Sequence, residues 1–371
     1  MYYENKKEKN VDRIIIYFFM VIIISLLVIL IYRNEIKETN INSSYDVNKL
    51  SLSTKTDEKM NDSKLIEKSV HSVVGISKLK QNGKLIFLEN YEQKIGIGSG
   101  IIVTDNGFIL TNEHVVGKKY SNCYVTLEDG KIYNGNVVWA DENIDLAIVK
   151  IDMKNLNYIE LADSDMLSLA DEVYAIGNPI GIEFQRTVTK GIISGINRTI
   201  KLNDNGKESY MEDLIQTDAT INEGNSGGAL INSKGELIGV NSIKINNAEG
   251  MGFAVPINII KPIIEKLTQD GRFEEAYLGL YGYDKEVIPY LDSNLNINKG
   301  VYVANVVTDG PLYKTGIQEG DIITKIDEIN LNKMNDLKKY IYSKNPGESV
   351  KLDVQRGNKI YEVSIKLGHK I

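Results

Sequence analysis

The first pattern along the chain is a continuous apolar run near its N-terminus. Residues Ile14–Tyr32 form 19 positions without a charged side chain. As a helix they would extend about 28 Å, close to the bilayer's hydrocarbon thickness of about 30 Å. A cleaved signal peptide would have a shorter apolar core, of about 7–15 residues, and a small-x-small cleavage site, which Tyr32–Glu35 lacks. We therefore expect an uncleaved, single-pass transmembrane anchor.

Charged residues on both sides of this run predict its orientation in the membrane. Four basic residues lie within residues 1–13, and two come soon after the run, at Arg33 and Lys37. This bias places residues 1–13 in the cytoplasm and the rest of the chain outside it. Residues 33–68 hold seven basic, seven acidic and one aromatic residue, too few apolar groups to offset the entropy of ordering. We interpret them as a disordered polar linker.

Short apolar runs of strand length, separated by turn residues, dominate residues 70–256. The clearest pair is Gly100–Thr104 and Phe108–Thr111, joined by the hairpin signal Asp105-Asn106-Gly107. Regularly spaced short strands predict an all-β sandwich or barrel. The further predicted strands are 124–127, 136–139, 146–150, 172–176, 187–193, 229–231 and 237–243.

Helical spacing occurs at two places beyond these strands. Apolar residues within Ile257–Gly271 follow a helical period, and Gly271 is a natural terminator. We expect this helix to close a first domain, residues 69–271. Residues 273–371 then form a second, α+β domain, in which Met334–Ser343 is the predicted helix.

Composition narrows the classes of function. The chain has 371 residues, of which 42% are hydrophobic and 25% charged, as in an ordinary globular protein. A net charge of −7 argues against a nucleic-acid binder, because phosphate contacts need clustered cations. The single cysteine, Cys123, excludes an intramolecular disulfide and a multi-cysteine metal site, and we expect it to be a small buried hydrophobe. We expect no metal and no cofactor, since no second histidine lies within ligand spacing of His114.

Three short motifs carry the candidate chemistry. In Gly224–Gly228 (GNSGG), glycines flank Ser226 and let backbone N–H groups converge on one point, as an oxyanion hole requires. His114 comes after a predicted strand, and Asp145 opens another. Taken singly, each has an ordinary alternative: a glycine-rich turn, a solvated histidine, a turn aspartate. Together their order along the chain, His-Asp-Ser, is that of chymotrypsin-type proteases, and they lie in a predicted all-β domain.

At this point the chain resembles the HtrA/Deg family of trypsin-like serine proteases with one C-terminal PDZ domain. The resemblance covers about residues 70–371, and Glu223 and Ala229 depart from it, because both positions are often Pro in the family. It implies a chymotrypsin-like double β-barrel. The motifs that carry it are Gly98–Val103, Thr111–Val116, Asp145–Lys150, Ala175–Gly181, Gln216–Ala219, Gly224–Gly228 and Gly252–Ile257.

The resemblance also implies a role for each site residue. Ser226 would be the nucleophile, His114 the general base and acid, and Asp145 the residue that orients His114. The oxyanion hole would lie in Gly224, Asn225 and Ser226, with the backbone N–H groups of Gly224 and Ser226 holding the oxyanion.

Substrate contacts are predicted more coarsely. By resemblance, Ser242 begins a strand that pairs with the substrate backbone. In chymotrypsin-like proteases a carboxylate six residues before the serine selects Lys or Arg, whereas here that position is Thr220. The nearby Ile221 and Ile243 are apolar. We therefore expect a preference for small or medium aliphatic P1 residues.

The second domain resembles a PDZ domain. Tyr277-Leu278-Gly279-Leu280 matches the loop that captures a peptide's C-terminal carboxylate, and Met334–Ser343 would be the groove helix. The alternative is that residues 277–280 are simply a first strand beside a closed groove.

Several functions stay open for such a chain. The first is an ATP-independent endopeptidase that degrades misfolded exported proteins in quality control, since no P-loop motif occurs. The second is a catalytically silent or weakly active envelope chaperone or sensor that binds unfolded proteins. The third is a processing protease that cuts membrane proteins. The resemblance also implies a homotrimer or higher oligomer, with the protease and PDZ domains outside the cytoplasm.

Overall fold

The computed structural model divides the chain into two units, residues 1–55 and residues 56–371. The residues that it describes are 17–18, 20–29, 63–64, 66–79, 95–178, 186–204, 207–222, 224–244, 250–291, 295 and 297–370.

In the first unit, residues 17–18 and 20–29 are helical. None of the helices in the described ranges is both long enough and apolar enough to cross a membrane. Residues 14–16, 19 and 30–32 of the predicted anchor Ile14–Tyr32, and nearly all of the predicted linker 33–68, lie outside the described residues.

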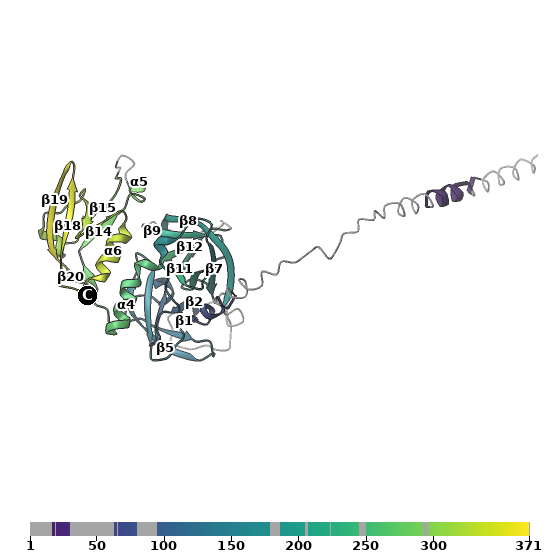
Figure 1. Ribbon diagram of the computed structural model, residues 1–371, viewed down its shortest axis with the longest axis horizontal. Helices are drawn as coiled ribbons and strands as arrows, with labels where there is room; N and C mark the ends of the chain where they lie inside the picture. The colour runs from purple at the N-terminus through teal and green to yellow at the C-terminus, as the bar shows by residue number, and fades with distance from the viewer. Residues whose placement is uncertain are drawn as a thin grey trace, which may run out of the picture. The chain divides into compact units, whose positions relative to one another are not determined.

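In the second unit, two groups of six described strands each close into an antiparallel barrel (Figure 1). The order is β1-β2-β3-β6-β5-β4 in the first barrel and β10-β11-β12-β9-β8-β7 in the second. The first comprises β1 Val73–Leu79, β2 Ile95–Ile102, β3 Phe108–Thr111, β4 Asn122–Thr126, β5 Ile132–Asp141 and β6 Leu146–Ile151. The second comprises β7 Glu172–Gly177, β8 Thr187–Asp204, β9 Lys207–Thr217, β10 Ala229–Asn232, β11 Leu237–Lys244 and β12 Gly252–Pro256.

The predicted strands correspond to nine of these twelve, with different lengths; β1, β9 and β12 were not among them. The hairpin at Asp105–Gly107 joins β2 to β3, and Gly107 has a φ of 96°, in the left-handed region that favours glycine. The strand predicted at 187–193 is instead β8, which continues to Asp204 and pairs with β9 through several register shifts. That extension is rich in polar residues, so its apolar alternation is weak and gives little strand signal.

Short helices connect and close the barrels. α3 (Glu113–Val116) comes after β3, and η2 (Ser164–Met166) precedes β7. The predicted helix 257–271 begins as the 3₁₀ turn η4 (Ile257–Ile259) and becomes helical only in α4 (Lys261–Asp270), which ends at the left-handed Gly271.

The C-terminal domain is a small sheet with one long helix. Its strands β14-β15-β16-β18-β19 form one sheet, and β13 pairs with β20. The elements are β13 Ala276–Tyr277, β14 Leu280–Tyr283, α5 Ile288–Leu291, β15 Val301–Val306, η5 Pro311–Lys314, β16 Ile322–Ile326, β17 Ile329–Asn330, α6 Met334–Ser343, β18 Ser349–Arg356, β19 Lys359–Lys366 and β20 Gly368–His369.

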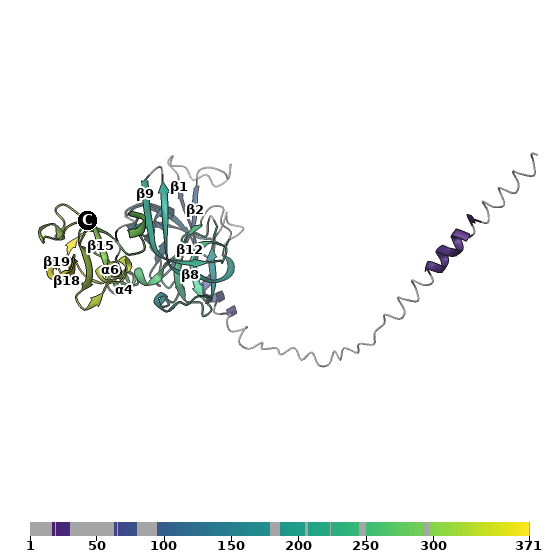
Figure 2. The ribbon, with the colours of Figure 1, turned by 90° about the horizontal axis from the view of Figure 1, so that it is seen from above.

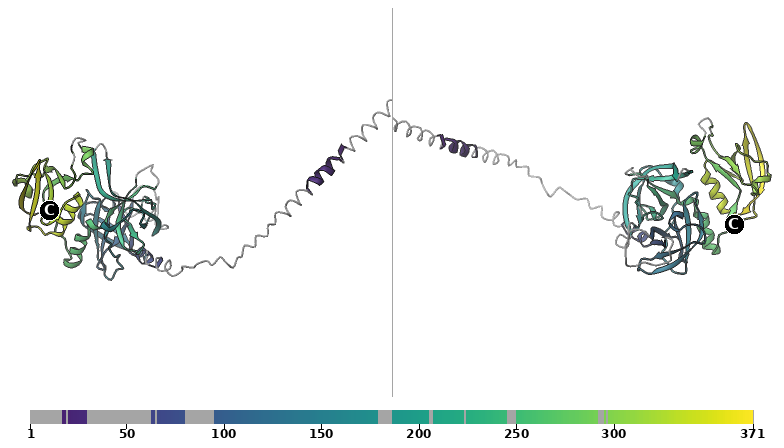
Figure 3. Two further views of the ribbon diagram at one scale, coloured as in Figure 1. Left: turned by 45° about the horizontal axis from the view of Figure 1, so that its top comes forward. Right: turned by 180° about the vertical axis from the view of Figure 1, so that it is seen from behind.

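Helix α6 joins the C-terminal sheet to the barrels. It contacts α4, η4 and β9, and it lies between the sheet and the barrels in Figure 2 and in both views of Figure 3. Tyr342 is buried at this contact. Its ring is edge-on to that of Trp139, with 5.9 Å between the ring centroids, and its hydroxyl donates to Asp141 Oδ2 at 2.8 Å. This end of α6 is therefore part of the barrel domain's core.

Candidate active site

The antiparallel pairing of β3 with β6 brings His114 and Asp145 together, because His114 comes just after β3 and Asp145 precedes β6. His114 Nδ1 lies 2.9 Å from Asp145 Oδ1 and 2.8 Å from Oδ2. The backbone N–H of His114 also donates to Oδ1, at 3.1 Å. The Asp145 side chain is 13% exposed and that of His114 51%, so a shielded carboxylate contacts an imidazole that solvent can reach.

Asp145 has an unusual backbone conformation. Its φ is 52°, in the left-handed region that Asp and Asn tolerate better than most residues. Asn112 Nδ2 donates to the carbonyl oxygen of Asp145 at 2.8 Å and so fixes this turn. In this turn conformation the Asp145 carboxylate points toward the His114 imidazole.

Ser242, on β11, connects Asp145 with Ser226. Its hydroxyl donates to Asp145 Oδ2 at 2.7 Å, and its carbonyl oxygen accepts a hydrogen bond from Ser226 Oγ at 3.1 Å. The sequence assigned Ser242 to substrate pairing alone and gave no indication of either contact. No local signal announces them, since Ser242 and Asp145 are 97 residues apart.

In this arrangement the Ser226 hydroxyl is turned toward Ser242. Within the described part of the chain, no hydrogen bond joins Ser226 Oγ to His114 Nε2. Catalytic hydrogen bonds are often long or absent without substrate and form only in the complex. Rotation of the Ser226 side chain would make Oγ available to the imidazole.

The electrostatic surroundings favour a protonated His114. Burial opposes the charged imidazole. The hydrogen bond and charge of Asp145, with the charge of Glu113, outweigh this and raise the pKa of His114 above its ordinary value of 6.5. Burial, together with the charge of Asp145, raises the pKa of Glu113.

The glycine-rich turn before β10 has a closely packed backbone. Gly224 has a φ of 93°, and a Cβ on Gly227 would lie 2.2 Å from Ser99 O. The N–H groups of Asn225, Gly227 and Gly228 donate to Asn222, Asn241 and Asn225 carbonyl oxygens, at 3.0, 2.8 and 2.9 Å. The N–H groups at the two ends of Gly224–Ser226 are the donors that the family resemblance assigns to an oxyanion hole.

The predicted specificity residues differ in what they contact. Ile221 is 3% exposed, and a Cβ on Gly252 would lie 2.8 Å from its Cδ1, so Gly252 leaves room for this side chain. Thr220 is exposed, and its carbonyl oxygen accepts from Thr189 Oγ1 at 2.9 Å. The side chain of Ile243 lies outside the described residues.

The predicted carboxylate loop Tyr277–Leu280 runs between β13 and β14. Gly279 has a φ of 86°, and its carbonyl oxygen accepts from Val307 N at 2.9 Å. Leu278 is 5% exposed and packs in the C-terminal core. The next strand, β14, is an edge of its sheet, so within the described residues one side of its backbone has no partner strand.

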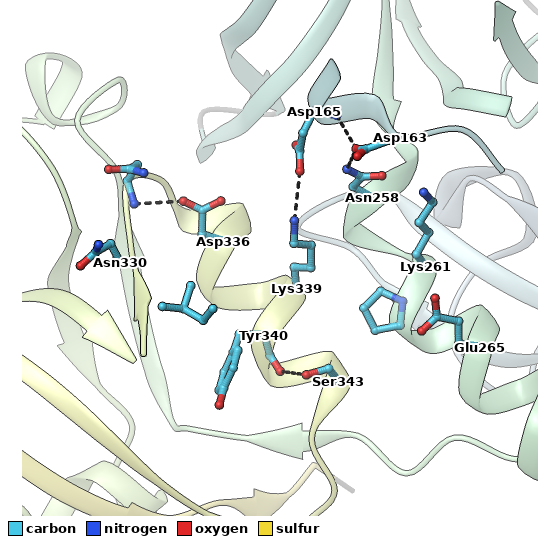
Figure 4. Close-up of a pocket in the computed structure, with 13 residues that line it drawn as sticks. Asp163, Asp165, Asn258, Lys261, Glu265, Asn330, Asp336, Lys339, Tyr340 and Ser343 are labelled. Atoms are coloured by element: carbon cyan, nitrogen blue, oxygen red, sulfur yellow. Dashed lines mark hydrogen bonds and ion pairs between the residues drawn. The ribbon is translucent and has the colours of Figure 1, made fainter. Parts of the chain in front are cut away.

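Other candidate groups lie outside this site. Burial raises the pKa of the Cys123 thiol to about 11, and the side chain is 3% exposed, as expected for a buried hydrophobe. A charged cleft between α4 and α6 contains Asp165, Lys261, Glu265 and Lys339 (Figure 4). The Lys339–Asp165 ion pair, at 3.1 Å, spans it, and the described residues hold no cluster of metal-ligating side chains.

Comparison with known protein families agrees with the two-domain organisation. The trypsin-like peptidase domain family matches residues 98–240, and the PDZ domain family matches residues 277–367.

Individual relatives cover most of the chain. It is 35% identical over 328 residues to the serine protease Do-like HtrA of Bacillus subtilis, covering 83% of this chain and 73% of that protein. It is 36% identical over 277 residues to the periplasmic pH-dependent serine endoprotease DegQ of Escherichia coli, covering 74% of this chain and 59% of that protein.

Solved structures agree. The HtrA-type protease AlgW with tripeptide superposes with a TM-score of 0.58 at 30% identity, covering 84% of this chain and 97% of that one. The serine endoprotease from Yersinia pestis has a TM-score of 0.56 at 30% sequence identity, covering 84% of this chain and 98% of that one. The chain therefore belongs to the HtrA/Deg family of trypsin-like serine endoproteases and carries a C-terminal PDZ domain.

Proposed function

We propose that this endoprotease works through Ser226, His114 and Asp145, and that it degrades misfolded or damaged exported proteins without ATP. The observation that carries the proposal is the chain of contacts from His114 through Asp145 and Ser242 to Ser226. It joins the three residue types of a serine-protease triad on elements that lie far apart in sequence.

Each residue has a defined step. Ser226 Oγ attacks the carbonyl carbon of the scissile bond, and His114 Nε2 takes the hydroxyl proton. The C–N bond breaks when His114 returns that proton to the leaving amine, which leaves an ester on Ser226. Water, activated by His114, then hydrolyses the ester. Asp145 accepts a hydrogen bond from Nδ1–H throughout, holds the tautomer and stabilises the imidazolium.

The oxyanion hole is the second part of the proposal. The N–H groups of Gly224 and Ser226 would donate to the oxygen of the tetrahedral intermediate, and removal of one such donor typically costs about 3–4 kcal/mol. In this arrangement Asn225 shapes the turn, because its own N–H donates to Asn222.

The test is cleavage of an unfolded protein. The full chain, purified in a mild detergent, is incubated with β-casein beside its Ser226→Ala variant. Cleavage by wild type alone supports the proposal. Equal cleavage by both proteins, or by neither, contradicts it.

A second candidate function is a silent or weakly active chaperone. It is favoured by the direction of the Ser226 hydroxyl, which donates to the Ser242 carbonyl oxygen. The Ser226→Ala variant separates the two functions. Suppression of the aggregation of a heat-denatured protein by that variant, with no cleavage by wild type, would support the chaperone.

Specificity and peptide binding are further parts of the proposal. The buried Ile221 and the uncharged Thr220 support small or medium aliphatic P1 residues. A peptide library tests this, and strong cleavage after Lys or Arg would overturn it. The Tyr277–Leu280 loop would capture peptide C-termini, so a peptide with a free apolar carboxylate should bind and its amidated form should not.

The location of the protease is proposed from the N-terminal run. Ile14–Tyr32 would anchor the chain, with the domains of residues 69–271 and 273–371 outside the cytoplasm. Recovery of the full chain in carbonate-washed membranes would support the anchor. Digestion of its PDZ domain by a protease added to intact cells would support the orientation. Homotrimer assembly stays a prediction that sedimentation of the purified chain can test.

A further inference from the structure

Every polar group of Ser99, on β2, makes a hydrogen bond, and two of these bonds reach the turn that contains Ser226. The side chain is fully buried, with 0% exposure. Its hydroxyl donates to the Gly224 carbonyl oxygen at 2.6 Å and accepts from the Asn178 N–H at 2.8 Å. Its backbone N–H donates to the Ser226 carbonyl oxygen at 2.8 Å, and its own carbonyl oxygen accepts from Thr111 Oγ1 at 2.6 Å.

These contacts hold the nucleophile turn at both ends. The carbonyl oxygens of Gly224 and Ser226 are the first and last of a three-residue segment, and both accept from Ser99. A peptide plane whose oxygen is fixed cannot rotate freely, so the N–H group of the next residue, which lies in the same plane, is fixed as well; here these are the N–H groups of Asn225 and Gly227. The plane between these two carries the Ser226 N–H and the Asn225 carbonyl oxygen, which accepts from the Gly228 N–H at 2.9 Å. The two N–H groups assigned to the oxyanion hole belong to this same segment.

Glycine conformation alone would not fix these planes. Gly224, with its φ of 93°, can reach many other conformations at little cost. An oxyanion hole needs donors held in place before the reaction, because reorganisation during the reaction would reduce their effect. The Ser99 hydroxyl supplies the restraint that Gly224 lacks.

We infer that Ser99 is a positioning residue for peptide-bond hydrolysis, whose hydroxyl holds the Gly224–Ser226 segment in the conformation that forms the oxyanion hole. This inference rests on the proposed function. Ser99 does not touch the substrate. Through the Asn178 N–H it also ties the turn to the end of β7, and through Thr111 to the strand that leads to His114.

The test is Ser99→Ala in the full chain, which removes the two hydroxyl contacts and keeps both backbone contacts. The matched control is Ser69→Ala. Ser69 is also buried, at 4% exposure, and its hydroxyl also donates to a distant carbonyl oxygen, that of Gly235, at 2.6 Å. The substrate is a chromogenic aliphatic peptide, and burst titration counts the competent active sites.

For Ser99→Ala we expect kcat per competent site to fall about 10- to 100-fold, less than the roughly 10²- to 10³-fold loss when a donor is removed outright. KM should change less than about threefold. The affinity for a peptide boronate, whose tetrahedral adduct places an oxygen in the hole, should fall in parallel with kcat/KM. Ser69→Ala should leave kcat per site, KM and the boronate affinity unchanged.

Other results overturn the inference. One is a Ser99→Ala variant with wild-type kcat per site. Another is a lower kcat with unchanged boronate affinity. If Ser99→Ala does not fold, Ser99→Cys, with a similar volume and a much weaker donor, is read by the same criteria. An inactive wild type would overturn the proposed function as well, whereas an active wild type with an unaffected Ser99 variant overturns this inference alone.

Discussion

Asp145→Asn is the substitution that tests the geometry of the triad most directly. Asn keeps the size and shape of the side chain, and it tolerates the left-handed φ of 52° at this position. The Asn112 contact to the backbone carbonyl is also kept. The change therefore removes the charge and replaces one of the two acceptor oxygens by an NH₂ donor, while leaving the turn intact, whereas Ala would remove both oxygens.

The hydrogen-bond partners predict how the new amide would be oriented. Oδ1 accepts from the backbone N–H of His114, which is only a donor, so the amide oxygen must occupy that place. The amide NH₂ then takes the place of Oδ2, 2.8 Å from Nδ1, and near the Ser242 hydroxyl, which can accept. This NH₂ favours the tautomer in which Nδ1 accepts its hydrogen bond, although the amide oxygen is also 2.9 Å from Nδ1. In that tautomer the imidazole proton is on Nε2, where a base is needed.

The size of the effect is set by this wrong tautomer. In a triad of this kind the Asp-to-Asn change lowers kcat about 10⁴-fold, or about 5.4 kcal/mol at 1.36 kcal/mol per tenfold. Loss of the carboxylate also removes the hydrogen bond and the charge of Asp145, which are the largest causes that raise the pKa of His114. The neutral imidazole is the active form, so activity falls at acidic pH as His114 becomes protonated. This fall, the acidic limb of the pH profile, should move to lower pH in the variant.

The assay is kcat/KM for a chromogenic peptide as a function of pH. For wild type we expect the acidic limb above pH 6.5, the ordinary value for histidine. For Asp145→Asn we expect a lower limb and a plateau reduced about 10⁴-fold. The exposed Asp152 gives a matched control, Asp152→Asn, which should match wild type. A plateau within tenfold of wild type, or a limb displaced to higher pH, would refute this reasoning.

Three further predictions rest on the described contacts. Glu113→Gln removes a charge that raises the pKa of His114, so the acidic limb of kcat/KM should move to lower pH, by less than in Asp145→Asn and without a change in the plateau. Tyr342→Phe removes a buried hydrogen bond to the Asp141 carboxylate, and urea unfolding should show a loss of about 1.5–3 kcal/mol. Burial, aided by the Asp284 carboxylate, raises the pKa of Glu212 from 4.5 to about 8. The folded protein therefore binds more protons than the unfolded chain, and stability from this group is lost as pH rises from 4.5 to about 8. Glu212→Gln should show a smaller decline in urea midpoint over that range.

Each of these has a result that counts against it. An unmoved acidic limb in Glu113→Gln would mean that solvent screens its charge from His114. The exposed Tyr281 offers a control, Tyr281→Phe, which should change stability by less than about 0.5 kcal/mol; a similar loss in both variants would remove the Asp141 contact as the cause. A urea midpoint that falls equally in wild type and Glu212→Gln would assign the pH dependence to other groups.

The sequence was sufficient to select His114, Asp145 and Ser226 as candidates because each is marked by its own surroundings. His114 and Asp145 adjoin strands whose apolar residues pair in the first barrel, and Ser226 lies between glycines before β10. Strand periodicity and turn chemistry act over a few residues, so they can be recognised without knowing the partner strand.

The contacts that organise the site could not be found in this way. Ser99 meets Gly224 across 125 positions, and Tyr342 meets Asp141 across 201. In the sequence Ser99 is an ordinary small polar residue of a strand, and the apolar pattern of α6 predicts one buried face without saying what covers the other. An apolar pattern reports that a side chain is buried, but a buried hydroxyl takes its role from the group it bonds. The hydroxyls of Ser99 and Ser242 therefore acquire their roles only when the two barrels close around them.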